Sequence, residues 1–174
     1  MKSVFALALC LFPIACSSTP SLPPLETVPK VDLNRYVGTW YQIAYFPAFF
    51  QKSCASDTKA IYSARADGTI DVRNECRKKN GDLSSIQATA RVIDATTNAK
   101  LKVKFFWFAP AGDYWVIDLG KNYEFAVVGE PKREYLWILS RTPEMNQTSY
   151  NEIIERARLK HFDVNRLEIT APLR

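Results

Sequence analysis

The sequence predicts an all-β domain, either an antiparallel barrel or a sandwich, followed by one C-terminal helix. Eight short segments rich in β-branched and aromatic residues follow one another, with turn signals between them. Several of them alternate between apolar and polar residues, as Leu101 and Val103 do around Lys102. After Pro143 the apolar residues recur at helical spacing instead.

The composition suits one globular domain. Of 174 residues, 47% are hydrophobic and 24% charged, which excludes a disordered chain. The net charge of +5 comes from basic residues scattered along the chain, not clustered as in a nucleic-acid-binding surface. A single histidine, His161, removes most histidine-based catalysis and every metal site built from several histidines.

The first thirty residues predict an export signal and a tether. Residues 1–15 combine a basic start with an apolar run, as secretory signals do. The sequence Ile-Ala-Cys-Ser around Cys16 is similar to the processing site of bacterial lipoproteins, which would make Cys16 an acylated N-terminus; an ordinary signal peptide that contains a cysteine is the alternative. Ser17, in place of Asp, implies the outer membrane. Residues 16–30 contain four prolines and are expected to form an extended tether to a domain over 31–174.

Turn residues separate the expected strands. Asp67-Gly68 is a hairpin signal, and residues 94–99 and 120–122 are further turns. Asn146 is the expected N-cap of the helix, whose apolar residues predict packing against the strands. The eight expected strands are Gly38–Phe46, Thr58–Arg65, Thr69–Cys76, Ser84–Ile93, Lys100–Trp107, Asp113–Leu119, Tyr123–Gly129 and Tyr135–Ser140.

Three motifs, in order, resemble those of one family. Residues 34–44 are similar to the Gly-x-Trp signature that opens lipocalins, residues 112–115 to the middle motif with its Asp-Tyr pair, and residues 135–143 to the last motif, which ends in an arginine. The motif residues are Gly38, Trp40, Asp113, Tyr114 and Arg141. The chain is thus identified as a member of the lipocalins over about residues 31–170, in the branch of bacterial outer-membrane lipoprotein and apolipoprotein D-like lipocalins.

The resemblance implies an eight-stranded antiparallel up-and-down barrel with one C-terminal helix packed on it. In this family the arginine crosses the tryptophan at the closed end, which gives Trp40 and Arg141 a structural role. The short turns would lie at that end, and the longer connections would ring an open mouth. A barrel of this size can hold one small ligand.

Alternation from Trp40 selects the side chains that would face the ligand. Trp137 matches a position that contacts ligand in the apolipoprotein D branch and is the strongest candidate. Small alanines opposite aromatic residues would leave a void, although ordinary barrel packing is the alternative for each single residue. The candidate ligand-binding residues are Trp137, Gln42, Ala44, Phe46, Tyr62, Ile70, Val72, Ala88, Ala90, Val103, Phe105 and Leu139, with Ala60 and Val92 on the same faces.

Two cysteines, Cys54 and Cys76, remain in the expected mature domain. Export would place them in an oxidising compartment, and a pair invites one bridge. Because Cys54 precedes one strand of the Asp67-Gly68 hairpin and Cys76 ends the other, both would lie at the open mouth. The sequence therefore predicts a Cys54–Cys76 disulfide.

The predicted function is binding, storage or transport of a hydrophobic ligand, either a fatty acid or a lysophospholipid, by a protein anchored to the outer membrane and facing the periplasm. A carrier of a tetrapyrrole, retinoid or other pigment, and a lipocalin-fold enzyme acting on lipid, are the alternatives. The sequence shows no Gly-rich phosphate loop, no Cys-x-x-Cys pair and no acidic metal cluster, so we expect no catalysis, cofactor or metal. The expected partners are a hydrophobic small molecule and the membrane, with no nucleic acid; a homodimer stays open.

Overall fold

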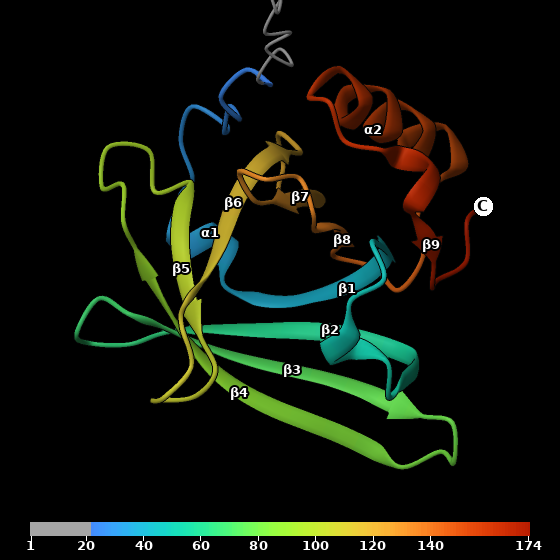
Figure 1. Ribbon diagram of the computed structural model, residues 1–174, viewed down its shortest axis with the longest axis horizontal. Coiled ribbons are helices and arrows are strands. Elements are labelled where there is room, and N and C mark those ends of the chain that lie inside the picture. Colours follow the sequence, from blue (N-terminus) through green and yellow to red (C-terminus); the bar gives the residue numbers. More distant parts are fainter. Residues whose placement is uncertain (1–21) are drawn as a thin grey trace, which may run out of the picture.

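The computed structural model describes residues 22–174, so the predicted signal peptide and Cys16 lie outside the described residues. Its strands form one antiparallel sheet in the order β2-β3-β4-β5-β6-β7-β8-β1-β9, which closes because β1 also pairs with β2 (Figure 1). The eight-stranded up-and-down barrel is therefore confirmed, with a two-residue β9 added beside β1. The strands are β1 Gly38–Tyr45, β2 Cys54–Ala64, β3 Ile70–Lys78, β4 Leu83–Val92, β5 Lys100–Lys104, β6 Gly112–Leu119, β7 Phe125–Gly129, β8 Leu136–Ser140 and β9 Glu168–Ile169.

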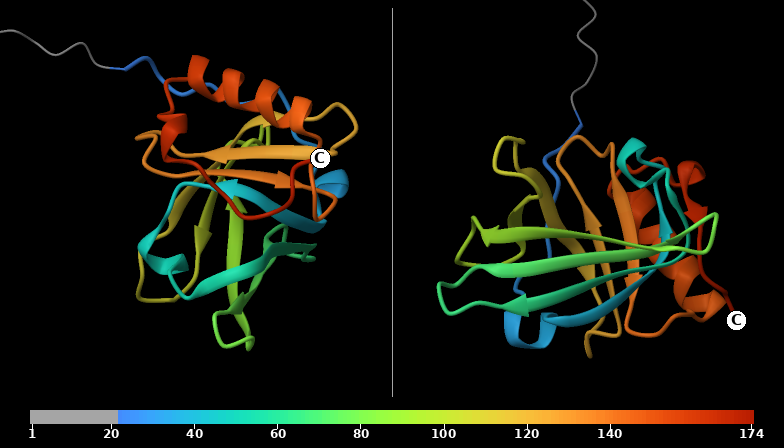
Figure 2. Two further views of the ribbon diagram at one scale, coloured as in Figure 1. Left: turned by 90° about the vertical axis from the view of Figure 1, so that its right-hand side faces the viewer. Right: turned by 90° about the horizontal axis from the view of Figure 1, so that it is seen from below.

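The two ends of the barrel differ. The short helix α1 (Leu33–Tyr36) enters β1 at one end, where short turns join the strands; this is the closed end. The 3-10 turn η1 (Phe49–Gln51) follows β1 at the opposite end, together with the longer β5–β6 and β7–β8 connections; this is the mouth. Figure 2 shows α1 and η1 at opposite ends of the barrel.

The helix α2 (Gln147–Leu159) lies outside the barrel, above β7 and β8 (Figures 1 and 2). Asn146 caps it as predicted, because its side chain accepts hydrogen bonds from the backbone N–H groups of Thr148 and Ser149. Arg156 on the helix donates to Asp118 of β6 at 2.6 Å. A second 3-10 turn, η2 (Val164–Arg166), leads from the helix to β9. None of the helices among residues 22–174 is long and apolar enough to cross a membrane.

The barrel wall separates two apolar layers. The inner layer lines the interior of the barrel, and the outer layer lies between the wall and α2. A β-bulge at Ile43 places two residues of β1 against one of β8, so Gln42 pairs with Leu139 and Ala44 with Ile138. An extra residue reverses the alternation beyond it. The prediction that Ala44 and Phe46 face the ligand is therefore wrong.

Ala44 and Phe46 instead belong to the outer layer beneath α2. The ring of Phe46 packs on that of Phe162, with centroids 6.2 Å apart. Because the register pairs Tyr45 with Trp137, Tyr45 takes the face that was predicted for its two neighbours.

Strand β5 is shorter than predicted. It ends at Lys104, and residues 105–111 form a turn and loop before β6. Phe105 was predicted to face the ligand, but it lies beyond the strand and is 37% exposed at the mouth. The inward prediction for Phe105 is wrong because strand alternation does not continue past the last ladder pair of the strand, Thr89 with Lys104.

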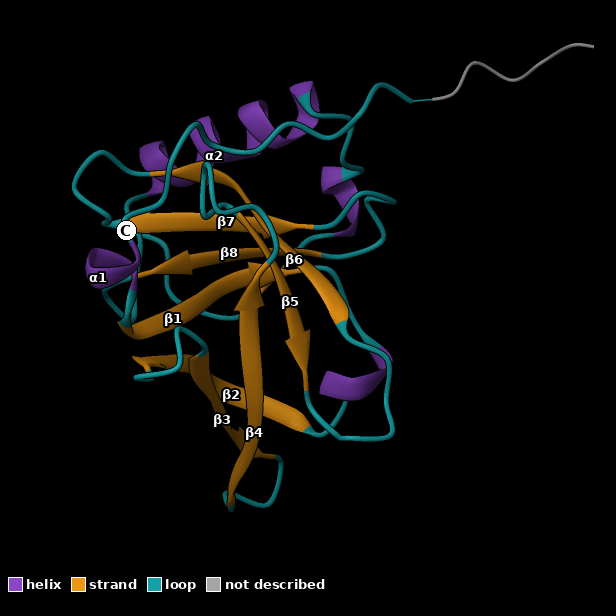
Figure 3. Ribbon diagram, turned by 90° about the vertical axis from the view of Figure 1, so that its left-hand side faces the viewer, coloured by secondary structure: helices purple, strands orange, loops and turns teal. Residues whose placement is uncertain are grey.

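Residues 22–30, expected to be part of the tether, instead lie against the barrel. The Val28 N–H donates to the Val116 carbonyl of β6, and Leu25 and Val31 are buried. Proline-rich composition indicates an extended backbone, which this segment has, but an extended segment can still dock on a folded surface when it carries apolar residues. Figure 3 shows this segment running along the outside of the barrel toward α1.

Candidate ligand-binding site

The interior of the barrel brings together most of the predicted ligand-binding side chains. Apolar residues from all eight barrel strands form one buried cluster there, and Trp137 and Val92 pack against it while remaining only partly buried. Tyr114 also points inward and is partly buried. The predicted residues found on this inner face are Gln42, Ala60, Tyr62, Ile70, Val72, Ala88, Ala90, Val92, Val103, Trp137 and Leu139.

Trp40 and Arg141 close one end of the barrel. The guanidinium of Arg141 lies 3.8 Å from the centroid of the buried Trp40 ring. Arg141 also donates to the backbone carbonyls of residues 35, 36, 37, 39 and 123. Gly38 has a positive φ of 98°, and a Cβ there would lie 3.3 Å from Arg141 Nη1. These contacts support the structural role predicted for Trp40 and Arg141.

Three tyrosines lie next to this closed end: Tyr36 and Tyr62 are buried, and Tyr114 is partly buried. The Tyr114 hydroxyl is 2.8 Å from that of Tyr36 and 3.0 Å from that of Tyr62. Burial raises the pKa of Tyr62 to about 12 and raises those of Tyr36 and Tyr114 further. The three hydroxyls therefore stay protonated at neutral pH and satisfy one another inside an apolar barrel. Asp113, the other residue of the middle motif, points outward and pairs with Lys102 at 2.9 Å.

A chain of side-chain amides spans the mouth. Trp137 Nε1 donates to Gln51 Oε1 at 3.0 Å, and Gln51 Nε2 donates to Gln42 Oε1 at 3.0 Å. Gln42 Nε2 then donates to Thr170 Oγ1 at 3.3 Å. Trp137 is thus held at the open end, where its indole faces the interior and its N–H is already bonded.

The η1 segment supplies mouth residues that sequence reasoning missed. Phe50 lies with its ring centroid 5.6 Å from that of Tyr135 and 6.5 Å from that of Trp137. Tyr135 stacks on Trp137 at 5.8 Å. Gln51 and Phe50 sit on a 3-10 turn, where no alternation could place them. The apolar run that follows Pro47 was the sequence signal that could have identified this segment as part of the mouth.

The predicted disulfide is confirmed. Cys54, the first residue of β2, is bonded to Cys76 of β3, with Cα atoms 5.5 Å apart. The bond joins the mouth ends of the two strands next to η1. It therefore supports the loop that carries Gln51.

The comparisons with known proteins agree with this geometry. The family model for the lipocalin-like domain matches residues 31–172. The chain belongs to the lipocalin family. Temperature-induced lipocalin-1 of Arabidopsis thaliana is 41% identical over 153 residues, covering 84% of this chain and 82% of that protein. The outer membrane lipoprotein Blc of Escherichia coli K12 is 39% identical over 155 residues (88% and 86%), and bovine apolipoprotein D is 30% identical over 154 residues (85% and 79%).

The fold of this lipocalin matches solved structures at much lower sequence identity. Insecticyanin from the tobacco hornworm Manduca sexta superimposes with a TM-score of 0.70 at 17% identity, over 88% of this chain and 92% of that one. Together with the Blc and apolipoprotein D relatives, the motifs place this lipocalin in the branch that the sequence predicted.

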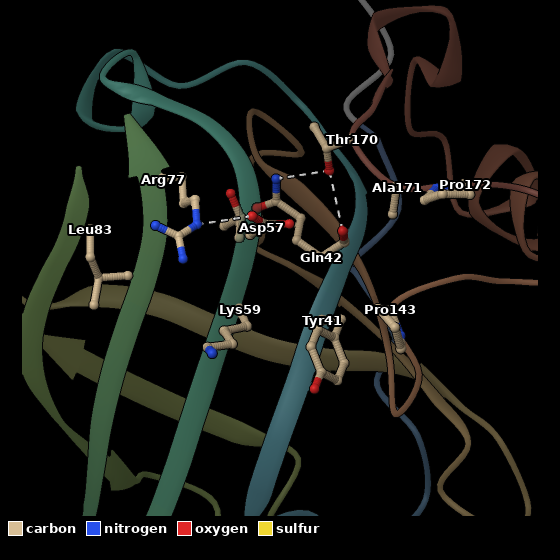
Figure 4. A pocket seen from close by; sticks show the side chains of 11 residues that line it. Tyr41, Gln42, Asp57, Lys59, Arg77, Leu83, Pro143, Thr170, Ala171 and Pro172 are labelled. Carbon is tan, nitrogen blue, oxygen red and sulfur yellow. Dashed lines mark hydrogen bonds and ion pairs between the residues drawn. The ribbon is translucent and has the colours of Figure 1, made fainter. Parts of the chain in front are cut away.

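This lipocalin also has a groove outside the barrel, where β2 separates from β1 and β9 takes its place (Figure 4). Its volume is about 300 Å³. Asp57 and Arg77 form an ion pair at 3.4 Å. Figure 4 shows this pair on one side of the groove and Thr170 on the other, with Gln42 between them. The charges in the groove are paired, so we do not assign a ligand to it. Over residues 22–174, no three His, Cys, Asp or Glu side chains are grouped as metal ligands.

Proposed function

We propose that this lipocalin binds a fatty acid or a lysophospholipid in its barrel, without catalysing a reaction, and stores or transports it in the cell envelope. The observation that carries the proposal is the inner lining. It combines small residues on β2 and β4 with aromatic residues that are only partly buried at the mouth, Trp137 among them. The relatives named outer membrane lipoprotein support an envelope location.

The ligand would enter tail first. The inner faces of β3 and β4 are apolar at every buried position, so a methylene chain against Val72, Ala88 and Ala90 gains about 0.8 kcal/mol per buried CH2 group. A head group would remain at the mouth, because the burial of a charge in this lining would cost several kcal/mol. Gln42 and Gln51 are the polar side chains at that position.

Cys16 would carry the acyl chains that anchor the protein to the outer membrane, on the periplasmic side. Several acyl chains on one residue give firm attachment, where a single chain gives only marginal binding.

Native mass spectrometry of protein made in its own envelope tests the proposal. We expect a bound acyl lipid to copurify, and Cys16→Ala to abolish fractionation with the outer membrane. A coloured ligand, or turnover of an added lipid, would contradict the proposal. Soluble wild-type protein with an unmodified N-terminus would contradict the anchor alone.

A further inference from the structure

We propose that the mouth of this lipocalin rests on the same lipid surface that holds Cys16, and that residues 105–111, the mouth loop, enter that surface. The inference rests on the acylation of Cys16 proposed above. In this orientation the ligand entrance faces the membrane.

The mouth loop presents aromatic rings to solvent. Trp107 is 87% exposed and Phe108 is 71% exposed. The rings of Phe106 and Phe108 stack with centroids 5.4 Å apart, and Trp107 packs edge-to-face on Phe108 at 5.7 Å. An ordered aromatic cluster exposed to water indicates a contact surface. Aromatic side chains, tryptophan above all, are typical of the membrane–water interface.

A second aromatic segment lies at the same end. Phe49 of η1 is 74% exposed, and its ring packs edge-to-face on that of Phe50 at 5.3 Å. In both views of Figure 2, η1 lies at the end of the barrel where the described chain begins, away from α1. The exposed aromatic residues therefore surround the entrance to the barrel and do not lie on its side.

The N-terminal segment is fixed so that it leaves at this end. Arg133, in the mouth connection between β7 and β8, is 8% exposed. Its Nη2 donates to the Pro23 carbonyl at 2.7 Å, and its Nε donates to the Lys160 carbonyl at 2.7 Å. Arg133 thus ties the start of the described chain to the mouth and to the end of α2. Figure 3 shows the chain running from there to α1 at the opposite end.

The length of chain before this point limits how far the anchor can lie from the mouth. Cys16 precedes Leu22 by six residues. A fully extended chain of that length spans at most about 20 Å. An acylated Cys16 would therefore keep the mouth rim within about 20 Å of the lipid surface, while α1 would lie at the far end of the barrel.

The charges around the mouth suit anionic phospholipid. Lys52, Lys104 and Lys132 are exposed, and none of them forms an ion pair with another residue in the range 22–174. A groove of about 400 Å³ beside Leu22 has Lys100, Lys132 and Arg133 as its charged lining residues. Glu134 is an exposed acid on the same rim. Lipid phosphates attract such lysines, whereas a second copy of this chain would bring like charges together.

Site-specific quenching tests the orientation. The acylated protein would carry one added cysteine, either Ala111→Cys in the mouth loop or Thr96→Cys in the closed-end turn, labelled with an environment-sensitive fluorophore. Both positions are exposed, and Cys54 and Cys76 are already bonded to each other. The protein is reconstituted in vesicles of phosphatidylethanolamine and phosphatidylglycerol that contain a lipid with a nitroxide on its acyl chain.

We expect the label at 111 to be quenched several-fold more than the label at 96, and Trp107→Ser with Phe108→Ser to reduce that difference. Equal quenching at the two sites of acylated protein would overturn the inference and leave the proposed function intact. An unquenched label at 111 in protein that cross-links as a dimer would assign the surface to a second copy instead. Protein without acyl chains would overturn both the anchor and this inference.

Discussion

Arg141 is expected to hold the closed end of the barrel, and its replacement by methionine tests this. Methionine keeps much of the side-chain length but removes the guanidinium. The substitution therefore deletes the contact with Trp40 at 3.8 Å and the hydrogen bonds to five backbone carbonyls of α1, β1 and the β6–β7 turn.

The magnitude follows from those contacts. The cation–π contact contributes roughly 0.5–2 kcal/mol. Hydrogen bonds from a charged donor contribute about 1.5–3 kcal/mol each, but Arg141 is partly exposed and water replaces some of them. We expect Arg141→Met to lower the free energy of unfolding by about 3–5 kcal/mol, a large part of the 5–15 kcal/mol typical of a domain.

Urea denaturation followed by circular dichroism measures this loss. Arg65→Met is the matched control, because Arg65 also lies at the closed end but, among residues 22–174, forms an ion pair with Asp71 alone, at 3.4 Å on the surface. A surface pair of this kind contributes about 0–1 kcal/mol. If the two methionine variants lose the same stability, Arg141 does not hold the closed end.

Three further predictions concern stability. The double variant Cys54→Ser with Cys76→Ser should lower the free energy of unfolding by about 3 kcal/mol, because the disulfide closes a loop between residues 22 positions apart. Wild-type protein under reductant should have the same free energy of unfolding as the variant. Gly38→Ala should destabilise the protein more than Gly68→Ala. Both glycines have a positive φ, but only the Cβ at 38 would contact a neighbouring side chain. Equal decreases in the melting temperature of the two variants would contradict this prediction. Burial raises the pKa of Tyr62 from 10.0 to about 12, so above pH 10 the unfolded chain loses this proton while the folded protein keeps it. The free energy of unfolding should therefore fall by about 1.4 kcal/mol per pH unit for this group, and less steeply in Tyr62→Phe. Parallel pH profiles of the two proteins would count against this.

The sequence predicted the barrel because period-2 alternation and turn chemistry are local signals. The motif residues Gly38, Trp40 and Arg141 could be placed because their spacing carries the resemblance to the family. Alternation failed at Ala44 and Phe46, where one extra residue at Ile43 reverses the faces. A bulge depends on the neighbouring strand and on the helix outside it, neither of which is visible in the local pattern.

Three other features also depended on tertiary context. Phe105 continues the pattern of β5, but the ladder to β4 and β6 ends before it. Gln51 reaches Trp137 from a 3-10 turn, so its role depends on where the chain folds back. Residues 22–30 have the composition of a tether, yet Arg133, far along the chain, holds Pro23 on the barrel.

The central claim is that the barrel interior binds an acyl chain. Ala88→Glu places a charge in the buried lining, and Gln87→Glu places the same charge on the exposed face one residue away on β4. Trp137→Ala should weaken binding by about 1 kcal/mol or more, because it removes part of the mouth lining while the barrel stays folded. Circular dichroism of each variant confirms that the barrel is present.

The most direct measurement is a calorimetric titration of fatty acids and lysophospholipids of increasing chain length against wild type, Ala88→Glu and Gln87→Glu. The affinity of wild type and Gln87→Glu should rise by about 0.8 kcal/mol, roughly fourfold in Kd, per methylene until the interior is full, and then level off. Ala88→Glu should not bind. Affinity that ignores chain length, or that survives the charge at 88, would contradict binding inside the barrel.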